Sequence, residues 1–286
     1  MLGTELSLLL EKAGIPFTGT GREVDITDPA ALREFAQVHP GSKQPFDCII
    51  NCAAYTAVDN AESDRETCRL LNTEAPRNLA VLAKKTGAAL IHISTDYVFN
   101  GQGSKPFTEE DTTDPVSVYG LSKRDGETGV LQENEKSWII RTAWLYGKHG
   151  KNFVHTMLKL MNDRDEISVV NDQHGSPTWT RDLAETICAF IRFAAEGKTL
   201  PYGIYHYTNE GQITWFDFAK EIYRHGRELG CVTKSCEVKP CTSAEYPAKV
   251  KRPIYSVLDK SKIKNALGVT IPLWNESLKG FFSEYA

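Results

Sequence analysis

The sequence contains no apolar run long enough to cross a membrane and no dense cluster of lysine and arginine. A membrane-spanning helix needs about 20 consecutive apolar residues. Proteins that bind the phosphate backbone of nucleic acids usually carry a basic face, whereas the formal net charge here is −4. We therefore expect neither membrane insertion nor nucleic-acid binding.

Paired cysteines are also missing. The seven cysteines form no Cys-x-x-Cys pair, and their odd number and scattered spacing are typical of reduced thiols in a cytoplasm. Cys231, Cys236 and Cys241 recur at five-residue intervals, but zinc sites usually use shorter paired spacings. The sequence therefore predicts a cytoplasmic protein, and no residue is assigned as a metal ligand.

A third absence is a glycine-rich loop. Dinucleotide-binding sheets open with a strand and a glycine-rich turn, where the backbone approaches a pyrophosphate at a helix N-terminus. This chain begins with MLGTELSLLLEKAG, an amphipathic helix pattern in which Gly3 matches only the last glycine of such a turn. We expect the first strand and two glycines, roughly ten residues, to lie upstream of Met1. The alternative is a chain that starts naturally with a surface helix.

Short apolar runs alternate with helical patterns through the first half of the chain. A continuous apolar run such as FDCIINCAA indicates a strand buried on both faces of a parallel sheet. The alternation predicts an α/β fold with a Rossmann-type, doubly wound parallel sheet. The expected strands cover residues 15–20, 46–54, 88–99 and 137–147, and the expected helices cover 28–39 and 74–87.

The rhythm loosens after about residue 150, where three more helical patterns alternate with short extended pieces. Residues 238–257 are rich in proline, lysine and tyrosine, which is typical of a loop. We expect residues 1–150 to form a dinucleotide-binding domain. Residues 151–286 are expected to form mainly a smaller C-terminal substrate domain, with some segments returning to the first domain.

The strand expected at residues 15–20 ends in TGTGREVD. NAD-preferring enzymes usually hold the ribose 2′-hydroxyl with an acidic residue at the end of this strand. The residues at the end of the strand in this chain are not acidic. Arg22 follows closely and could meet a 2′-phosphate. This pattern favours NADPH over NADH.

Three polar residues are spaced for ketone reduction. Thr95 lies near the end of the strand expected at 88–99, Tyr119 follows 24 residues later, and Lys123 lies one helical turn beyond Tyr119. A tyrosine, with a pKa of about 10, is a weak acid–base group at neutral pH, and a nearby ammonium lowers that pKa. A threonine hydroxyl can hydrogen-bond the carbonyl oxygen. His92 alternates with apolar residues and is interpreted as an interior histidine.

The chain resembles the extended short-chain dehydrogenase/reductases, and within that family the branch of dTDP-4-dehydrorhamnose reductases. The resemblance runs nearly end to end, and two of its strings, STDYVF and NDQ-G-PT, are specific to this branch. The other matching strings are NCAAYTAVDNAES, LLNTEAPRNLA, PVSVYGLSK, RTAWLYG, KNFVHTML and AKVKRPIYSVLD.

The resemblance implies reduction of the 4-keto group of dTDP-4-dehydro-6-deoxy-L-mannose to dTDP-L-rhamnose, for cell-surface polysaccharide synthesis. It makes Tyr119 the proton donor, Lys123 the residue that tunes the tyrosine and binds the ribose, and Thr95 the third catalytic residue. It implies NADPH or NADH as cofactor and leaves a homodimer open. Some relatives are reported to bind Mg²⁺, but no ligand cluster in the sequence places one.

The resemblance also implies contact residues by position. The implied cofactor contacts are Met1, Leu2, Gly3, Asp25, Ile26, Ala54, Tyr55, Thr56, Asn72, Tyr119 and Lys123. The implied substrate contacts are Val58, Thr95, Asp96, Tyr97, Trp144 and Arg252, the last of which is a candidate for the nucleotide phosphates.

Two alternatives remain at the level of the sequence. One is a related enzyme that reduces or epimerises a different nucleotide sugar. The other is a non-catalytic relative of this branch, such as the regulatory subunit of methionine adenosyltransferase, which keeps the fold as a binding module. The complete set of Thr95, Tyr119 and Lys123 favours an enzyme.

Overall fold

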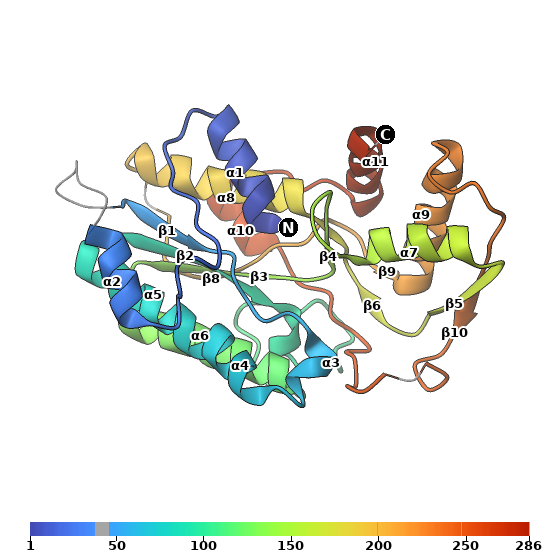
Figure 1. Ribbon diagram of the computed structural model, residues 1–286, viewed down its shortest axis with the longest axis horizontal. Coiled ribbons are helices and arrows are strands. Elements are labelled where there is room, and N and C mark those ends of the chain that lie inside the picture. Colours follow the sequence, from blue (N-terminus) through green and yellow to red (C-terminus); the bar gives the residue numbers. More distant parts are fainter. Residues whose placement is uncertain (38–45, 199, 247, 286) are drawn as a thin grey trace.

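The structure, a computed structural model, describes residues 1–37, 46–198, 200–246 and 248–285 (Figure 1). Its centre is a sheet of four parallel strands in the order β1-β2-β3-β8. These strands are β1 (Cys48–Asn51), β2 (Ala89–Thr95), β3 (Ser137–Thr142) and β8 (Gly203–His206). The expected α/β fold with a parallel, Rossmann-type sheet is confirmed.

Helices cover both faces of this sheet (Figure 1). Because successive side chains of a strand point to opposite faces, Ile91 and Ile140 enter one core while Leu90 and Ile139 enter another. The first core is closed by α1 (Leu2–Lys12), α8 (Thr180–Ala195) and α10 (Ser261–Leu267). The second is closed by α2 (Pro29–Gln37), α5 (Ala75–Thr86) and α6 (Val118–Glu133).

Short helical turns connect these elements on the α6 side of the sheet. They are α3 (Val58–Ala61), α4 (Arg65–Arg69), the π-helical turn η1 (Leu70–Glu74) and the 3₁₀ turn η2 (Asp96–Val98). Helix α5 ends at Gly87, whose φ of 75° is the left-handed conformation that glycine adopts without strain. The sequence predicted this end of the helix correctly.

The second half of the chain builds a smaller apolar core around Tyr146, Phe218 and Phe281. Its helices are α7 (Phe153–Asp163), α9 (Trp215–Glu228) and α11 (Trp274–Tyr285). Its short strands pair as β4 (Leu145–Tyr146) with β7 (Thr178–Trp179), β5 (Glu166–Val170) with β10 (Glu237–Cys241), and β6 (His174–Gly175) with β9 (Ile213–Thr214). Strand β8 belongs to the second half of the sequence, yet it completes the central sheet.

Three of the expected strands differ from the structure. Residues 15–20 form no strand; in the described part of the chain only β2 pairs with β1, so 15–20 has no ladder to join. For the same reason β1 is an edge strand, and three of its four residues are only half-buried instead of buried on both faces. The strand expected at 137–147 is interrupted at Trp144, which has a φ of 49°.

Part of the loop expected at 238–257 is also a strand, because β10 pairs with β5 in parallel register. All seven cysteines are free thiols. Within the described residues, no helix combines the length and the apolar character needed to cross a bilayer.

Candidate active site

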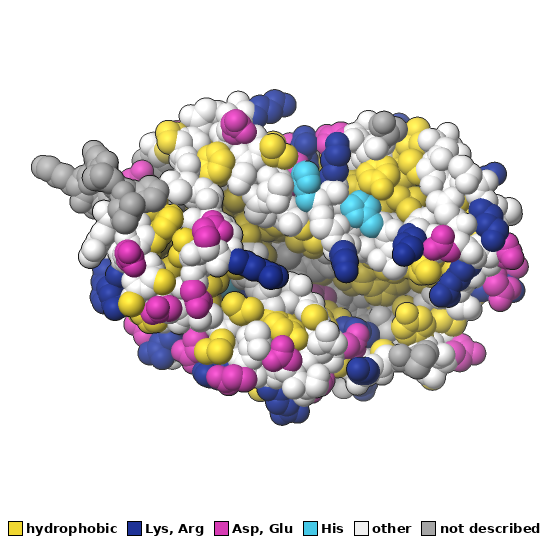
Figure 2. All heavy atoms as spheres, viewed as in Figure 1, with side chains coloured by type: hydrophobic (Ala, Val, Ile, Leu, Met, Phe, Trp, Pro, Cys, Tyr) yellow, Lys and Arg dark blue, Asp and Glu magenta, His cyan; other side chains and the backbone are white. Residues whose placement is uncertain are grey.

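The parallel strands β1, β2 and β3 bring their carboxyl ends to one edge of the central sheet. Ligands of open α/β sheets bind at this edge. The molecule is hollowed between the part built on the sheet and the part built on α7 and α9, and lysine or arginine side chains stand at the rim of the hollow (Figure 2). Thr95, the last residue of β2, is buried at this edge.

Tyr119 lies in the first turn of α6 and is 8% exposed. The Ser117 hydroxyl caps the helix by accepting a hydrogen bond from the Gly120 backbone N–H at 3.1 Å. A Cβ atom at Gly120 would lie only 2.2 Å from the carbonyl oxygen of Tyr97. Glycine at this position therefore allows α6 to sit directly against η2, and this close approach brings Tyr119 next to Thr95.

Thr95 lies close enough to Tyr119 for its hydroxyl to lower the pKa of the phenol, an effect smaller than that of burial. Burial raises the pKa of Tyr119 above its usual value, so the phenol keeps its proton at neutral pH. A protonated phenol is the form that can donate a proton to a carbonyl oxygen. The lowering of this pKa that the sequence predicted from a neighbouring lysine stays a prediction for the complex.

Lys123 follows one turn later on the same helix and is 1% exposed. Its ammonium nitrogen donates to the carbonyl oxygen of Ile93 at 2.7 Å and lies 3.3 Å from Nε2 of His92. Burial lowers the pKa of Lys123 to about 8, although the negative charge of Glu127 acts in the opposite direction. A lysine in this range changes charge close to neutral pH, which is unusual outside functional sites.

Asp96 is a buried acid next to Thr95. The Thr95 hydroxyl donates to its Oδ1 at 3.0 Å, while Oδ2 has no hydrogen-bond partner among the described residues. Burial raises the pKa of Asp96 to about 6, and the nearby hydroxyls of Thr95 and Ser256 only partly offset that effect. The unpartnered oxygen leaves hydrogen-bonding capacity for a ligand at the predicted substrate position.

The loop that follows β1 carries three predicted cofactor contacts, Ala54, Tyr55 and Thr56. Asn72 holds this loop, because its side chain accepts from the Tyr55 N–H at 2.9 Å and donates to the Tyr55 carbonyl at 3.0 Å. Asn72 is fully buried and also donates to the Ser122 hydroxyl of α6. The structure thus gives Asn72 a role in shaping the loop, whereas Thr56 is exposed.

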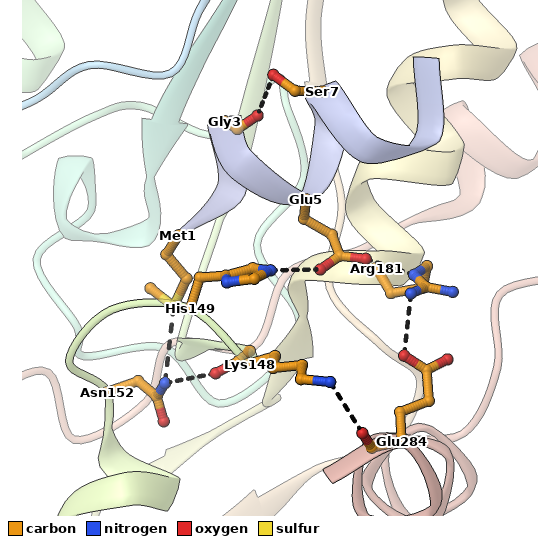
Figure 3. Close-up of polar contacts among 10 residues, drawn as sticks. Met1, Gly3, Glu5, Ser7, Lys148, His149, Asn152, Arg181 and Glu284 are labelled. Atoms are coloured by element: carbon orange, nitrogen blue, oxygen red, sulfur yellow. Dashed lines mark hydrogen bonds and ion pairs between the residues drawn. The ribbon is translucent and has the colours of Figure 1, made fainter. Parts of the chain in front are cut away.

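The first turn of α1 lies beside the end of β1, because a Cβ atom added at Gly3 would lie 3.6 Å from Cβ of Cys52. No side chain caps this helix at Met1, so its first backbone N–H groups are available to an anion. Met1 faces the loop that carries His149 and Asn152 (Figure 3). The residues of this turn fit a pyrophosphate, which needs N–H donors at a helix N-terminus.

Ion pairs fix α1 in this place. Glu5 is 3% exposed and accepts a hydrogen bond from Nε of Arg181 at 2.5 Å, while Nη2 of Arg181 donates to Glu284 at 2.9 Å (Figure 3). Arg181 thereby joins α1, α8 and α11. His149 adds a weaker contact to Glu5 at 3.8 Å.

Two further predicted cofactor contacts lie in the segment before α2. The Asp25 carboxylate accepts from the backbone and the hydroxyl of Thr27, and these bonds lower its pKa. Ile26 packs against the core on the α5 side of the sheet. Asn78 of α5 donates to the carbonyls of Ile26 and Thr27, so this segment is attached to the domain that would bind the cofactor.

Arg252 reaches from the C-terminal segment to the sheet domain. Its guanidinium forms an ion pair with Asp59 of α3 and donates to the Tyr97 hydroxyl at 3.3 Å. Burial raises the pKa of Tyr97 to about 12. Val58 begins the same short helix as Asp59. The structure therefore brings four residues of the predicted substrate site together, with Asp59 as a fifth member: Val58, Asp96, Tyr97 and Arg252.

Trp144 lies in the break between β3 and β4. Its indole stacks on Trp215 with ring centroids 3.6 Å apart and an angle of 10° between the planes. Gly175 leaves the room for this ring, because a Cβ there would lie 2.5 Å from the indole. Two stacked indoles form a rigid aromatic surface of the kind that binds sugar or base rings.

Sequence reasoning missed Asp59, Trp215 and the contact of His92 with Lys123. Asp59 lies inside a matching string, NCAAYTAVDNAES, so its position was available as a signal. Trp215 begins α9, and nothing in the helical pattern of that segment distinguishes it from an ordinary apolar residue of the helix. Among the described residues, no group of three or more His, Cys, Asp or Glu side chains could hold a metal ion.

Comparison with known proteins agrees with this geometry. The chain is 44% identical over 284 residues to dTDP-4-dehydrorhamnose reductase of Streptomyces griseus, covering 99% of this chain and 90% of the relative. It is 36% identical over 285 residues to dTDP-4-keto-6-deoxy-D-glucose reductase of Streptomyces niveus, covering 99% and 93%. A crystal structure of dTDP-4-dehydrorhamnose reductase from Bacillus anthracis in complex with NADP superimposes with a TM-score of 0.89 at 37% identity, covering 99% of this chain and 95% of that one. The family model described as the RmlD substrate binding domain matches residues 1–286, and the chain belongs to that family.

Proposed function

We propose that this chain reduces the 4-keto group of dTDP-4-dehydro-L-rhamnose to give dTDP-L-rhamnose, with NADPH as the cofactor. The observation that carries the proposal is the closeness of Thr95 to Tyr119, with buried Lys123 one turn away, in a chain 44% identical to a reductase of that name. The bound nicotinamide would supply the hydride. Every other step belongs to side chains of the protein.

Tyr119 and Thr95 would act on the carbonyl oxygen. The Thr95 hydroxyl would donate a hydrogen bond that polarises the carbonyl, and Tyr119 would deliver the proton as negative charge develops on the oxygen. The tyrosine suits this role because burial keeps it protonated. Lys123 would stabilise the phenolate left behind and would hold the cofactor ribose.

The first turn of α1 and the loop after β1 would hold the rest of the cofactor. Met1, Leu2 and Gly3 offer uncapped N–H groups for the pyrophosphate. The dinucleotide in the solved relative from Bacillus anthracis is NADP, and the exposed side chain of Arg22 supports NADPH over NADH because it could meet a 2′-phosphate.

The substrate would lie between α3 and the Trp144–Trp215 pair. Arg252 would bind the diphosphate, and its ion pair with the Asp59 carboxylate supports this role because it shows that the guanidinium can hold an anion here. Trp144 would contact the sugar or base ring, and the free Oδ2 of Asp96 would accept from a sugar hydroxyl.

The test follows NADPH absorbance during reduction of dTDP-4-dehydro-L-rhamnose by the wild type and by Tyr119→Phe. We expect Tyr119→Phe to lose about 10²- to 10⁴-fold in kcat while still binding NADPH. Tyr146→Phe is the matched control, because the Tyr146 ring is fully buried in the smaller core built by the second half of the chain and its hydroxyl has no hydrogen-bond partner in the described part of the chain. An inactive wild type, or a Tyr119→Phe variant as fast as the control, would overturn the proposal.

A second candidate substrate is another dTDP-linked 4-keto-6-deoxy sugar. The relative from Streptomyces niveus is named for such a substrate and is 36% identical over nearly the whole chain. Both sugars would present the same diphosphate to Arg252 and the same keto group to Tyr119. Measuring kcat/KM for the two substrates in parallel decides between them, because each proposal predicts the larger value for its own sugar.

A further inference from the structure

His92 is a fully buried residue of β2 that contacts Lys123 from behind. Its Nε2 lies 3.3 Å from Nζ of Lys123, and its Nδ1 lies 3.1 Å from Nδ2 of Asn51. Asn51, the last residue of β1, is also buried. The three buried side chains therefore form a row across two neighbouring strands and α6.

The hydrogen bonds decide which nitrogen of His92 carries the proton. The Ala53 backbone N–H donates to Oδ1 of Asn51 at 3.0 Å, so the amide must present its oxygen to Ala53 and its NH₂ group to His92. Nδ1 of His92 must then accept. Because a neutral imidazole has one donor and one acceptor, Nε2 carries the N–H and points it at Lys123. Burial lowers the pKa of His92 well below its usual value, so the ring is neutral.

This orientation has a consequence for Lys123. An ammonium group has three donors and no acceptor, so it cannot accept the Nε2–H and is repelled by it. A neutral amine has a lone pair, so it can accept from His92 while it donates to the Ile93 carbonyl. The fixed tautomer thus favours the uncharged form of Lys123.

The other groups around Lys123 do not replace this effect. Glu127, one turn further on α6, favours the charged lysine, but its carboxylate is engaged by Nε and Nη2 of Arg141 at 2.9 and 2.7 Å. Cys68 of α4 acts in the same direction as Glu127. Tyr119 lies on the same helix and stays protonated, so it brings no charge.

We propose that Asn51 and His92 are positioning residues of the reductase: Asn51 locks His92 in the Nε2–H tautomer, and His92 sets the pH at which Lys123 loses its charge. The proposal rests on the proposed catalytic role of Lys123, and it adds a device behind the catalytic set that adjusts it. Neither residue touches a reacting atom. Reduction then declines with rising pH where Lys123 becomes neutral, because Tyr119 loses the ammonium that stabilises its phenolate.

The first measurement needs no activity. NMR of ¹⁵N-histidine-labelled wild type shows directly which imidazole nitrogen of His92 carries the proton, and we expect Nε2. The signal of the Lys123 side chain, assigned by its loss in Lys123→Met, should titrate with a midpoint near 8. Finding the proton on Nδ1 of His92 overturns the proposal, even if the enzyme is fully active.

Asn51→Asp reverses the tautomer with little change in shape. A carboxylate can only accept, so Ala53 N–H and His92 Nδ1–H would both donate to it, and Nε2 would accept from the Lys123 ammonium. We expect the titration midpoint of Lys123 to rise by about one pH unit or more, and the basic limb of the kcat/KM profile to move upward with it.

Asn171→Asp is the control for added charge. Its oxygen keeps the hydrogen bond from the Thr214 hydroxyl at 2.9 Å, in the second half of the chain. We expect it to leave the midpoint of Lys123 unchanged. An unmoved midpoint in Asn51→Asp contradicts the proposal. A moved midpoint in a protein without reductase activity supports the tautomer device and counts against the proposed function alone, so the two failures are distinguishable.

Discussion

Replacing Glu127 with glutamine tests how the site is held together. Glu127 and Arg141 are 3% and 2% exposed, and they form a two-pronged ion pair between α6 and β3. The Arg141 guanidinium also lies over the Phe99 ring at 5.1 Å and contacts Nε2 of His206 at 3.4 Å. No solvent can compensate Arg141 at this depth once its partner loses its charge.

The expected loss is large for a substitution that changes so little volume. Removing one member of a buried ion pair typically costs about 3–5 kcal/mol, because the remaining charge is left unpaired. A glutamine at this position keeps one oxygen that can accept a hydrogen bond from Arg141. Its NH₂ group faces the second N–H donor of the guanidinium and cannot accept from it. We therefore expect Glu127→Gln to lower the free energy of unfolding by about 3 kcal/mol.

Glu133→Gln is the matched control on the same helix. Glu133 also accepts two hydrogen bonds from one arginine, Arg77, but the two side chains are 28% and 54% exposed. Exposed pairs contribute about 0–1 kcal/mol. Urea unfolding followed by circular dichroism at pH 7 compares the two variants. The reasoning is refuted if Glu127→Gln costs no more than Glu133→Gln.

Two further predictions concern the same region. Gly126→Ala would place a Cβ 2.0 Å from the Asn72 carbonyl oxygen, so we expect a loss of about 1–3 kcal/mol. Gly129→Ala meets only Arg77, at 3.4 Å or beyond, and should stabilise α6 by up to about 1 kcal/mol, so urea unfolding should show opposite signs. The pKa of Asp96 is raised from 3.8 to about 6, so its stabilising contribution is complete at low pH and is lost as pH rises through about 6. The stability of the wild type relative to Asp96→Asn should accordingly fall by about 2 kcal/mol between pH 4 and pH 7, and a constant difference would contradict the shift.

The sequence predicted the elements that local patterns determine. Strand β2 and helices α2 and α5 follow from apolar runs, a proline at the helix start and Gly87 at the helix end. The sequence also grouped Thr95 with Tyr119, from their spacing along the chain. The structure adds how they meet, because Gly120 lets α6 sit against η2, which directly follows Thr95.

The remaining features depend on partners distant in sequence. Residues 15–20 read as a strand, but a strand needs a neighbour, and in the described chain β1 pairs only with β2. The interpretation of His92 as an interior histidine was correct about burial. Its chemistry was hidden, since the tautomer depends on Asn51 and on the Ala53 N–H, 41 and 39 positions away. Periodicity reports which face a side chain occupies and carries no information about hydrogen-bond direction.

Arg252 shows why a residue predicted to bind a ligand can have a protein partner in the structure. A cation facing a partly closed cleft needs an anion nearby, because a poorly solvated charge without a partner is costly, and Asp59 supplies it. If Arg252 meets the substrate diphosphate, as proposed, the ligand must replace this carboxylate. The free energy gained on binding is then only the difference between the ion pair of Arg252 with the ligand and its ion pair with Asp59. This difference favours ligands whose charge exceeds that of one carboxylate. Arg252 would therefore contribute more to selecting nucleoside diphosphates than to overall affinity, and Asp59 would be the residue that enforces the selection.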